Sequence, residues 1–211
     1  MQSTWRRLRR RLKHTCLYSW YRRYLLWKEY RAWRRGGTGS TPHLVKQRVV
    51  REYARRSGAR VLVETGTYRG DMVAAMRHRF SRIYSIELDA ALCADAQRRF
   101  ARQRHITILQ GDSGIILGRL LPGIAEPCLF WLDGHYSEGI TARGEHNTPI
   151  RQELEAISRH AYLAQDVILI DDARCFTGQD DYLRLAEVQA WAAAHGLGTC
   201  QVQNDIIRIH R

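Results

Sequence analysis

Short apolar runs alternate with helical patterns along most of this chain. Each of the first five runs ends at polar residues and is followed by a segment with apolar positions every three or four residues. Two further runs follow one another without a helical segment between them. The predicted strands are residues 60–65, 82–88, 105–111, 127–133, 166–171, 198–203 and 205–210. Because parallel neighbours need crossover helices, the pattern predicts an α/β fold, a Rossmann-like, doubly wound, seven-stranded, mostly parallel sheet with a C-terminal antiparallel hairpin.

A different pattern occupies residues 1–35, which hold twelve Lys and Arg residues and one acid, Glu29. The remaining residues carry nearly equal numbers of bases and acids, so +11 of the net charge of +13 belongs to this tail. Its apolar positions recur every three or four residues, which predicts a basic amphipathic helix before the sheet. These positions are Trp5, Leu8, Leu12, Cys16, Trp20, Tyr24, Trp27 and Tyr30.

The chain therefore divides into three predicted parts. The tail, residues 1–35, is followed by a Gly-rich linker at 36–41 and by one globular domain at 42–211. Aromatic side chains among arginines favour binding to an anionic membrane surface. Docking on a partner, packing of the tail on its own domain, and binding of RNA stay open as alternatives, with nucleic acid the least favoured.

The sequence lacks two features that would indicate a membrane-spanning or a secreted protein. No apolar run approaches the roughly 18 residues of a membrane span, and the Arg-rich start lacks the apolar stretch of a secretory signal. The five cysteines are scattered singly, which predicts reduced thiols. We expect a cytoplasmic protein, and peripheral attachment to the inner membrane surface stays open. The sequence does not determine its oligomeric state.

Acidic residues end all five strands that precede the hairpin. They are Glu64, Glu87, Asp112, Asp133 and the pair Asp171 and Asp172. Ligands of parallel sheets bind beyond the carboxyl ends of the strands, so we expect these acids to meet at one edge. Their repulsion calls for a cation or for hydrogen-bond donors between them.

The turn after the first strand, VETGTYRG, carries an acid-x-Gly-x-x-x-Gly pattern, from Glu64 through Gly66 to Gly70. It lacks the glycine spacing of a dinucleotide fold and the Lys of a phosphate loop, which disfavours a pyrophosphate ligand. Glu87, at the end of the second strand, is placed to accept hydrogen bonds from two ribose hydroxyls. Asp112 and Ser113 after the third strand offer an acceptor and a donor to an adenine edge.

In this order and at these spacings, the motifs resemble class I S-adenosylmethionine-dependent methyltransferases over roughly residues 42–210. The resemblance implies S-adenosylmethionine as cofactor. The cofactor-binding positions that it implies are Glu64, Gly66, Thr67, Gly70, Glu87, Asp112, Ser113 and Asp133.

The segments WLDGHYSEG and ILIDDAR are similar to those of metal-dependent O-methyltransferases of the macrocin and catechol type. That resemblance implies a Mg²⁺ ion on Asp133, Asp171 and Asp172, and it makes Asp133 or His135 the candidate base that deprotonates the acceptor. The Asp-Asp pair is nearer the macrocin-like enzymes, whereas the polar loop at 135–150, with Arg143, Glu145 and His146, matches neither type.

The two resemblances together imply Mg²⁺-assisted O-methylation of a sugar, a glycan or a small acceptor that resembles a natural product. Two alternatives stay open: an RNA-directed methyltransferase that uses the basic tail, and a non-catalytic membrane-associated protein with the same fold. Base-methylating enzymes place an Asn/Asp-Pro-Pro-aromatic segment where this chain reads LDGHY, which disfavours nucleic-acid methylation.

Overall fold

The computed structural model describes residues 16–36, 40–134 and 148–211. They fall into two units, residues 1–48 and residues 49–211. The unit boundary lies within a continuous helix, so the tail, linker and domain limits remain predictions. In chain order the helices are α2 (Cys16–Arg34), α3 (His43–Ser57), α4 (Asp71–Met76), α5 (Ala90–Phe100), α6 (Ser113–Leu120), α7 (Ile150–Ser158) and α8 (Leu185–Ala194). The strands are β1 (Val61–Thr65), β2 (Arg82–Glu87), β3 (Ile106–Gln110), β4 (Cys128–Leu132), β5 (Val167–Ile170), β6 (Thr199–Gln203) and β7 (Ile206–His210).

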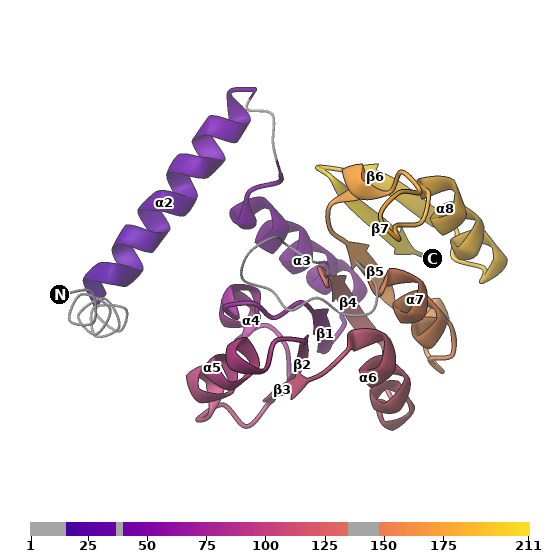
Figure 1. Ribbon diagram of the computed structural model, residues 1–211, viewed down its shortest axis with the longest axis horizontal. Coiled ribbons are helices and arrows are strands. Elements are labelled where there is room, and N and C mark those ends of the chain that lie inside the picture. Colours follow the sequence, from indigo (N-terminus) through magenta and orange to yellow (C-terminus); the bar gives the residue numbers. More distant parts are fainter. Residues whose placement is uncertain (1–15, 37–39, 135–147) are drawn as a thin grey trace. The chain divides into compact units, whose positions relative to one another are not determined.

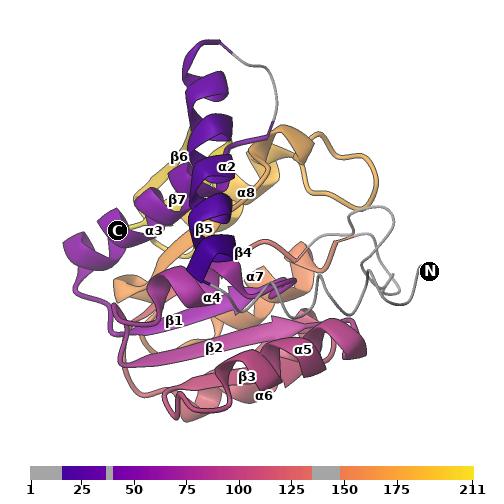
Figure 2. The ribbon, with the colours of Figure 1, turned by 90° about the vertical axis from the view of Figure 1, so that its left-hand side faces the viewer.

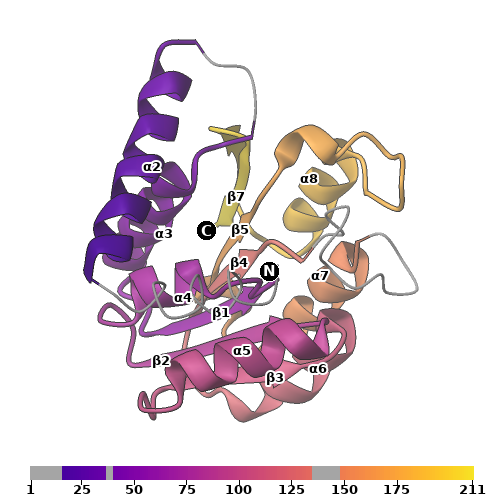
Figure 3. The ribbon, with the colours of Figure 1, turned by 60° about the vertical axis from the view of Figure 1, so that its left-hand side comes forward.

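The second unit is built on one seven-stranded sheet with the strand order β3-β2-β1-β4-β5-β7-β6. Strands β1 to β5 pair in parallel, while β7 runs antiparallel to both β5 and β6. Figure 2 shows β1, β2 and β3 side by side, and Figure 3 shows the succession from β4 through β5 to β7. The predicted fold class is therefore confirmed, including the antiparallel hairpin at the end of the chain.

Helices cover both faces of the sheet, with α4 and α5 on one face and α6, α7 and α8 on the other (Figure 1). Every residue of β1, β4 and β5 is buried, as expected for central parallel strands that are covered on both sides. The turn between β6 and β7 consists of Asn204 and Asp205, whose φ angles are 54° and 56°. Two positive φ angles in a two-residue loop match the right-handed twist of a hairpin.

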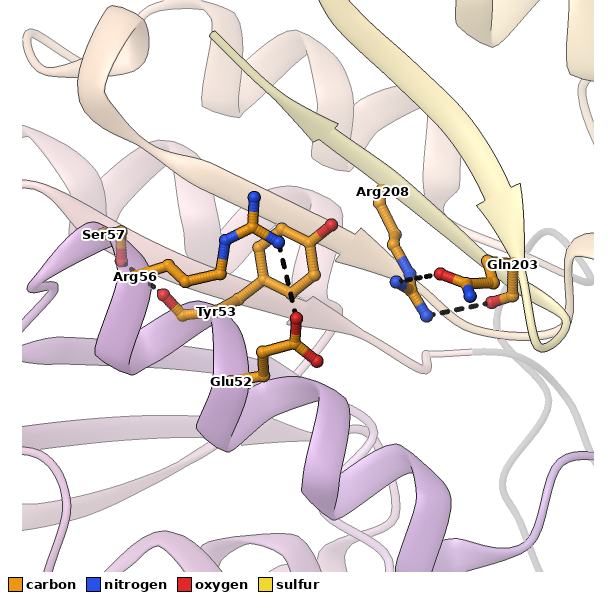
Figure 4. A network of polar contacts seen from close by, with 6 residues as sticks. All are labelled: Glu52, Tyr53, Arg56, Ser57, Gln203 and Arg208. Carbon is orange, nitrogen blue, oxygen red and sulfur yellow. Dashed lines mark hydrogen bonds and ion pairs between the residues drawn. The ribbon is translucent and has the colours of Figure 1, made fainter.

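The hairpin also contacts the second-unit part of α3 (Figure 4). Arg208 of β7 is 5% exposed, and its guanidinium lies 5.6 Å from the centre of the Tyr53 ring. It donates hydrogen bonds to the side chain and the backbone carbonyl of Gln203, at 2.6 and 3.3 Å. On the helix surface, Arg56 lies 5.1 Å from the same ring and pairs with Glu52. A phenol ring that faces a guanidinium favours the buried charge.

The ends of the parallel strands are aligned by the sheet register. Thr65 of β1 pairs with Ile86 of β2 and Leu132 of β4, and Leu132 pairs with Ile170 of β5. The residues that follow these strands must therefore meet at one edge of the sheet. Strand order reverses between β1 and β4, which is where ligands bind in open α/β sheets.

Candidate active site

The turn after β1 lies directly against the end of β4. Gly66 has a φ of +80°, and a Cβ atom added there would lie 2.3 Å from the carbonyl oxygen of Asp133. Gly70 has a φ of +69°, and an added Cβ would lie 2.7 Å from the ring of Phe100. A side chain at either position would strain the backbone and meet a neighbour. The two glycines of the predicted motif are thus required by close packing as well as by the turn.

Glu64 lies beneath this turn and is only 2% exposed. Its carboxyl accepts a hydrogen bond from the Ser85 hydroxyl, which lies 2.5 Å from the hydroxyl of Thr67. The pKa of Glu64 is raised from 4.5 to about 8, chiefly by burial; the Ser85 hydrogen bond lowers it, and the nearby charges of Asp133 and Glu87 add to the rise. In the ligand-free protein at neutral pH this carboxyl is therefore mostly protonated.

Glu87 is 5% exposed and uses both of its oxygens. One accepts the backbone N–H of Tyr68 at 2.6 Å, and the other accepts the N–H of Asp89 at 2.9 Å. A carboxylate offers about four acceptor positions, so each oxygen keeps one. The Tyr68 contact was not foreseen from the sequence. It means that Glu87 also anchors the Gly-rich turn.

Asp112 and Ser113 begin α6, beside the turn after β3. The Asp112 side chain caps the helix by accepting the N–H of Gly114 at 2.8 Å. The Ser113 hydroxyl donates to Glu153 of α7 at 2.6 Å. Glu153 also lies against the turn after β4, because a Cβ atom on Gly134 would be 3.1 Å from its carboxylate.

Glu153 was missed in the sequence reading. It is 1% exposed, and burial raises its pKa to about 7, with added effects from Asp112 and Asp133 and an opposing one from the Ser113 hydrogen bond. A signal was present in the sequence, because Glu153 shares a helix face with Ile150, Leu154 and Ile157, which are all buried. An acid among core positions indicates a site residue.

The acids after β4 and β5 come together as predicted. Asp133, Asp171 and Asp172 each offer one oxygen, and these three atoms lie within 4.8 Å of one another. Asp171 and Asp172 are buried. Carboxylate oxygens are the ligands that Mg²⁺ prefers, so both the donor set and its spacing fit a hard divalent cation.

Two residues beside these acids were not foreseen. Arg174 donates to Asp172 at 2.8 Å and also pairs with Asp205 in the turn between β6 and β7, so a cation on Asp172 would compete with a guanidinium. Tyr182 lies near the cluster as well. Burial raises the pKa of its hydroxyl, and the charges of Asp172 and Asp133 add to that effect.

The candidate base His135 lies outside the described residues, as do Arg143, Glu145 and His146. At the opposite, amino-terminal ends of β4 and β5, a second buried cluster joins Asp166 to the Cys128 backbone and to His160. The two ring nitrogens of His160 contact Asp166 at 2.6 Å and the carbonyl of Ile124 at 3.1 Å. Both partners offer hydrogen-bond acceptors, which favours an imidazole that carries two protons. We assign the cluster a structural role, since its polar atoms already bond one another.

No protein-family model matches the chain. A ribosomal RNA small subunit methyltransferase A from Acidobacterium capsulatum is 36% identical over 55 residues, which cover 26% of this chain and 19% of that protein. The match thus spans about a fifth of the relative's length.

Solved structures match much more of the chain. A putative caffeoyl-CoA O-methyltransferase from Staphylococcus aureus superposes with a TM-score of 0.54 at 12% identity, over 87% of this chain and 90% of that one. An SAH-bound methyltransferase from Podospora anserina gives 0.53 at 15% identity, over 78% and 77%. This is the class I methyltransferase fold. A putative O-methyltransferase from Klebsiella pneumoniae, at 0.53 and 17% identity over 83% of each chain, has the same fold. In this methyltransferase fold, the acids described above occupy the ligand-binding edge of the sheet.

Proposed function

We propose that the protein is an S-adenosylmethionine-dependent methyltransferase that acts on a hydroxyl oxygen with the help of a divalent cation. The observation that carries the proposal is the convergence of Asp133, Asp171 and Asp172 beside the Gly66 turn. Metal chelation favours an acceptor with neighbouring hydroxyls, as in a sugar, a glycan or a small catechol-like molecule.

On the cofactor side, Glu87 would accept hydrogen bonds from the two ribose hydroxyls with the acceptor positions that Tyr68 and Asp89 leave open. Glu64 would lie near the cationic methionine end. A positive charge there would lower the raised pKa of Glu64, so we expect cofactor binding to release a proton near neutral pH. The bound cofactor supplies the methyl group.

On the acceptor side, the three aspartates would hold the cation, which when bound lowers the pKa of the acceptor hydroxyl. Asp133 is the least buried of them, and it adjoins the Gly66 turn. It is therefore the member of the set best placed to meet both ligands. His135 follows it by two residues and stays the alternative base. Positioning of the acceptor against the methyl group would supply much of the rate.

The test measures metal binding and methyl transfer separately. Mn²⁺ binding, followed by electron paramagnetic resonance, should weaken at least roughly tenfold in Asp133→Asn and Asp171→Asn. Asp95→Asn is the matched control, because that side chain is 62% exposed and pairs only with Arg98 among the described residues. Transfer from labelled S-adenosylmethionine to catechol and sugar acceptors should stop in chelator and return with Mg²⁺.

Each of the other results would overturn a stated part of the proposal. Full activity in chelator would make Asp133 a simple base and the acid pair structural. A folded protein that binds neither S-adenosylmethionine nor its product would overturn the methyltransferase assignment and favour the non-catalytic alternative.

RNA is the second candidate acceptor, because the local relative from Acidobacterium capsulatum is named for ribosomal RNA and the tail is basic. If RNA is the acceptor, labelled methyl groups should appear in RNA, and binding should weaken steeply with salt. The absence of an aromatic base-stacking motif after β4 makes it the weaker candidate.

A further inference from the structure

The first unit has one aromatic side that packs within the unit. Tyr30 of α2 accepts a hydrogen bond from Arg48 at 3.0 Å, and the Arg48 guanidinium lies 4.8 Å from the centre of its ring. The ring of Trp33 stacks at 6.4 Å from Tyr30. The predicted aromatic stripe is therefore not exposed along its whole length, because Tyr30 packs against Arg48 of α3.

Two further aromatic residues of α2 are exposed. Tyr24 is 56% exposed and Trp27 is 48% exposed, while the neighbouring Leu25 is 39% exposed. Arg31 lies 4.7 Å from the centre of the Trp27 ring. Positions 24, 27, 28 and 31 follow the spacing of one helix face, so two large aromatic rings share that face with Lys28 and Arg31. We call these four residues the exposed face of α2.

We infer that the exposed face of α2 binds an anionic lipid surface. Tyr and Trp favour the headgroup region, and Lys and Arg beside them attract anionic lipid. Among the described helices, none has the length and hydropathy of a membrane span, so α2 would lie in the interface rather than cross it. The charge of the tail supports binding to anionic lipid, because residues 1–35 contain twelve basic residues and one acid. The inference is independent of the proposed methyl transfer.

The experiment is co-sedimentation of the full chain with vesicles of phosphatidylcholine alone or mixed with phosphatidylglycerol. The protein should sediment with the mixed vesicles and stay in solution with the neutral ones. Replacing both rings, in Tyr24→Ala with Trp27→Ala, should weaken binding to mixed vesicles roughly tenfold or more. Ile115→Ala with Val202→Ala is the matched control, because it removes two exposed apolar side chains from the second unit, 57% and 44% exposed.

A conservative replacement separates the interface from a folding effect. Trp27→Phe should keep vesicle binding but lose part of the tryptophan quenching by brominated lipid that the wild-type protein shows. Arg31→Gln should weaken binding more than Arg159→Gln, an exposed arginine of the second unit. Circular dichroism and the thermal melt should be unchanged in all of these variants.

Several results would overturn the inference. Equal binding to neutral and anionic vesicles would remove the electrostatic part, and unchanged binding by the double alanine variant would remove the aromatic part. Tighter binding to a single-stranded RNA oligonucleotide than to mixed vesicles, with steep salt dependence, would assign the tail to nucleic acid. A double alanine variant that loses its cooperative melt while Trp27→Phe also fails to bind would mean that the rings pack on protein.

Discussion

Replacement of Glu87 should weaken cofactor binding, and the hydrogen bonds that its carboxylate makes determine by how much. Each oxygen of this carboxylate already accepts one backbone N–H, from Tyr68 or from Asp89. The two positions that remain match the two ribose hydroxyls. A hydrogen bond to a charged group contributes about 1.5–3 kcal/mol. Loss of one such bond in Glu87→Ala should weaken binding about 10- to 150-fold, at about 1.4 kcal/mol for each factor of ten, and loss of both should weaken it more.

The assay is isothermal titration of the full chain with S-adenosylhomocysteine. Glu126→Ala is the control, because Glu126 pairs with Arg82 on the surface and lies before β4, away from the Gly-rich turn. A ligand that lacks the ribose 2′-hydroxyl tests the contact itself. The wild-type protein should bind this ligand more weakly than the parent, whereas Glu87→Ala should not distinguish the two.

This design separates the ribose contact from the anchoring of Tyr68. If Glu87→Ala is folded and binds the product within about twofold of wild type, the ribose assignment is wrong. If the variant binds weakly but still discriminates against the deoxy ligand, Glu87 acts only by holding the turn.

Three further predictions concern stability. Gly66→Ala should lower the free energy of unfolding by about 2 kcal/mol or more, because of its positive φ and the contact with the Asp133 carbonyl. The melting temperature should fall by about 4–8 °C. A decrease of less than about 1 °C would contradict the close approach. The raised pKa of Glu64 means that the stability it contributes is lost as pH rises from 4.5 through about 8. The melting temperature of Glu64→Gln should therefore rise relative to that of the wild-type protein as the pH increases from 5 to 8.5. Parallel plots of melting temperature against pH for the two proteins would refute this. Burial lowers the pKa of His160, but the hydrogen bond and the charge of Asp166 outweigh burial and raise this pKa above 6.5. The stability that His160 contributes is therefore present below pH 6.5 and is lost as the pH rises through its pKa in the folded protein. His160→Gln should cost about 3 kcal/mol at pH 6 and less at pH 9 in chemical denaturation, and an equal cost at both would show a neutral ring.

The sequence alone was enough to predict the architecture. Apolar runs separated by helical spacing determine which segments become strands, and the missing helix before residues 205–210 predicts the hairpin. Because parallel strands end at one edge, the meeting of Asp133 with Asp171 and Asp172 could also be expected, and the structure brings them together. The roles of these residues remain predictions.

Contacts between distant elements were decided only by the tertiary structure. Glu153 meets Ser113 because α7 packs beside α6, and Arg174 reaches Asp205 because the β6–β7 turn lies next to the end of β5. On α2, the predicted stripe divides into a packed part and an exposed part, because Tyr30 packs on Arg48 while Tyr24 and Trp27 are exposed. Periodicity reports which side of an element is apolar, but not which neighbour covers it.

The same limit applies to charge. The sequence places Glu64 at a strand end as an ordinary carboxylate, whereas the fold buries it beneath the Gly66 turn and raises its pKa to about 8. His160 reads as one more polar residue until Asp166 and the Ile124 carbonyl are found at its two ring nitrogens. Desolvation and hydrogen-bond partners set the protonation of a buried group, and both depend on segments that meet only when the sheet and its covering helices assemble.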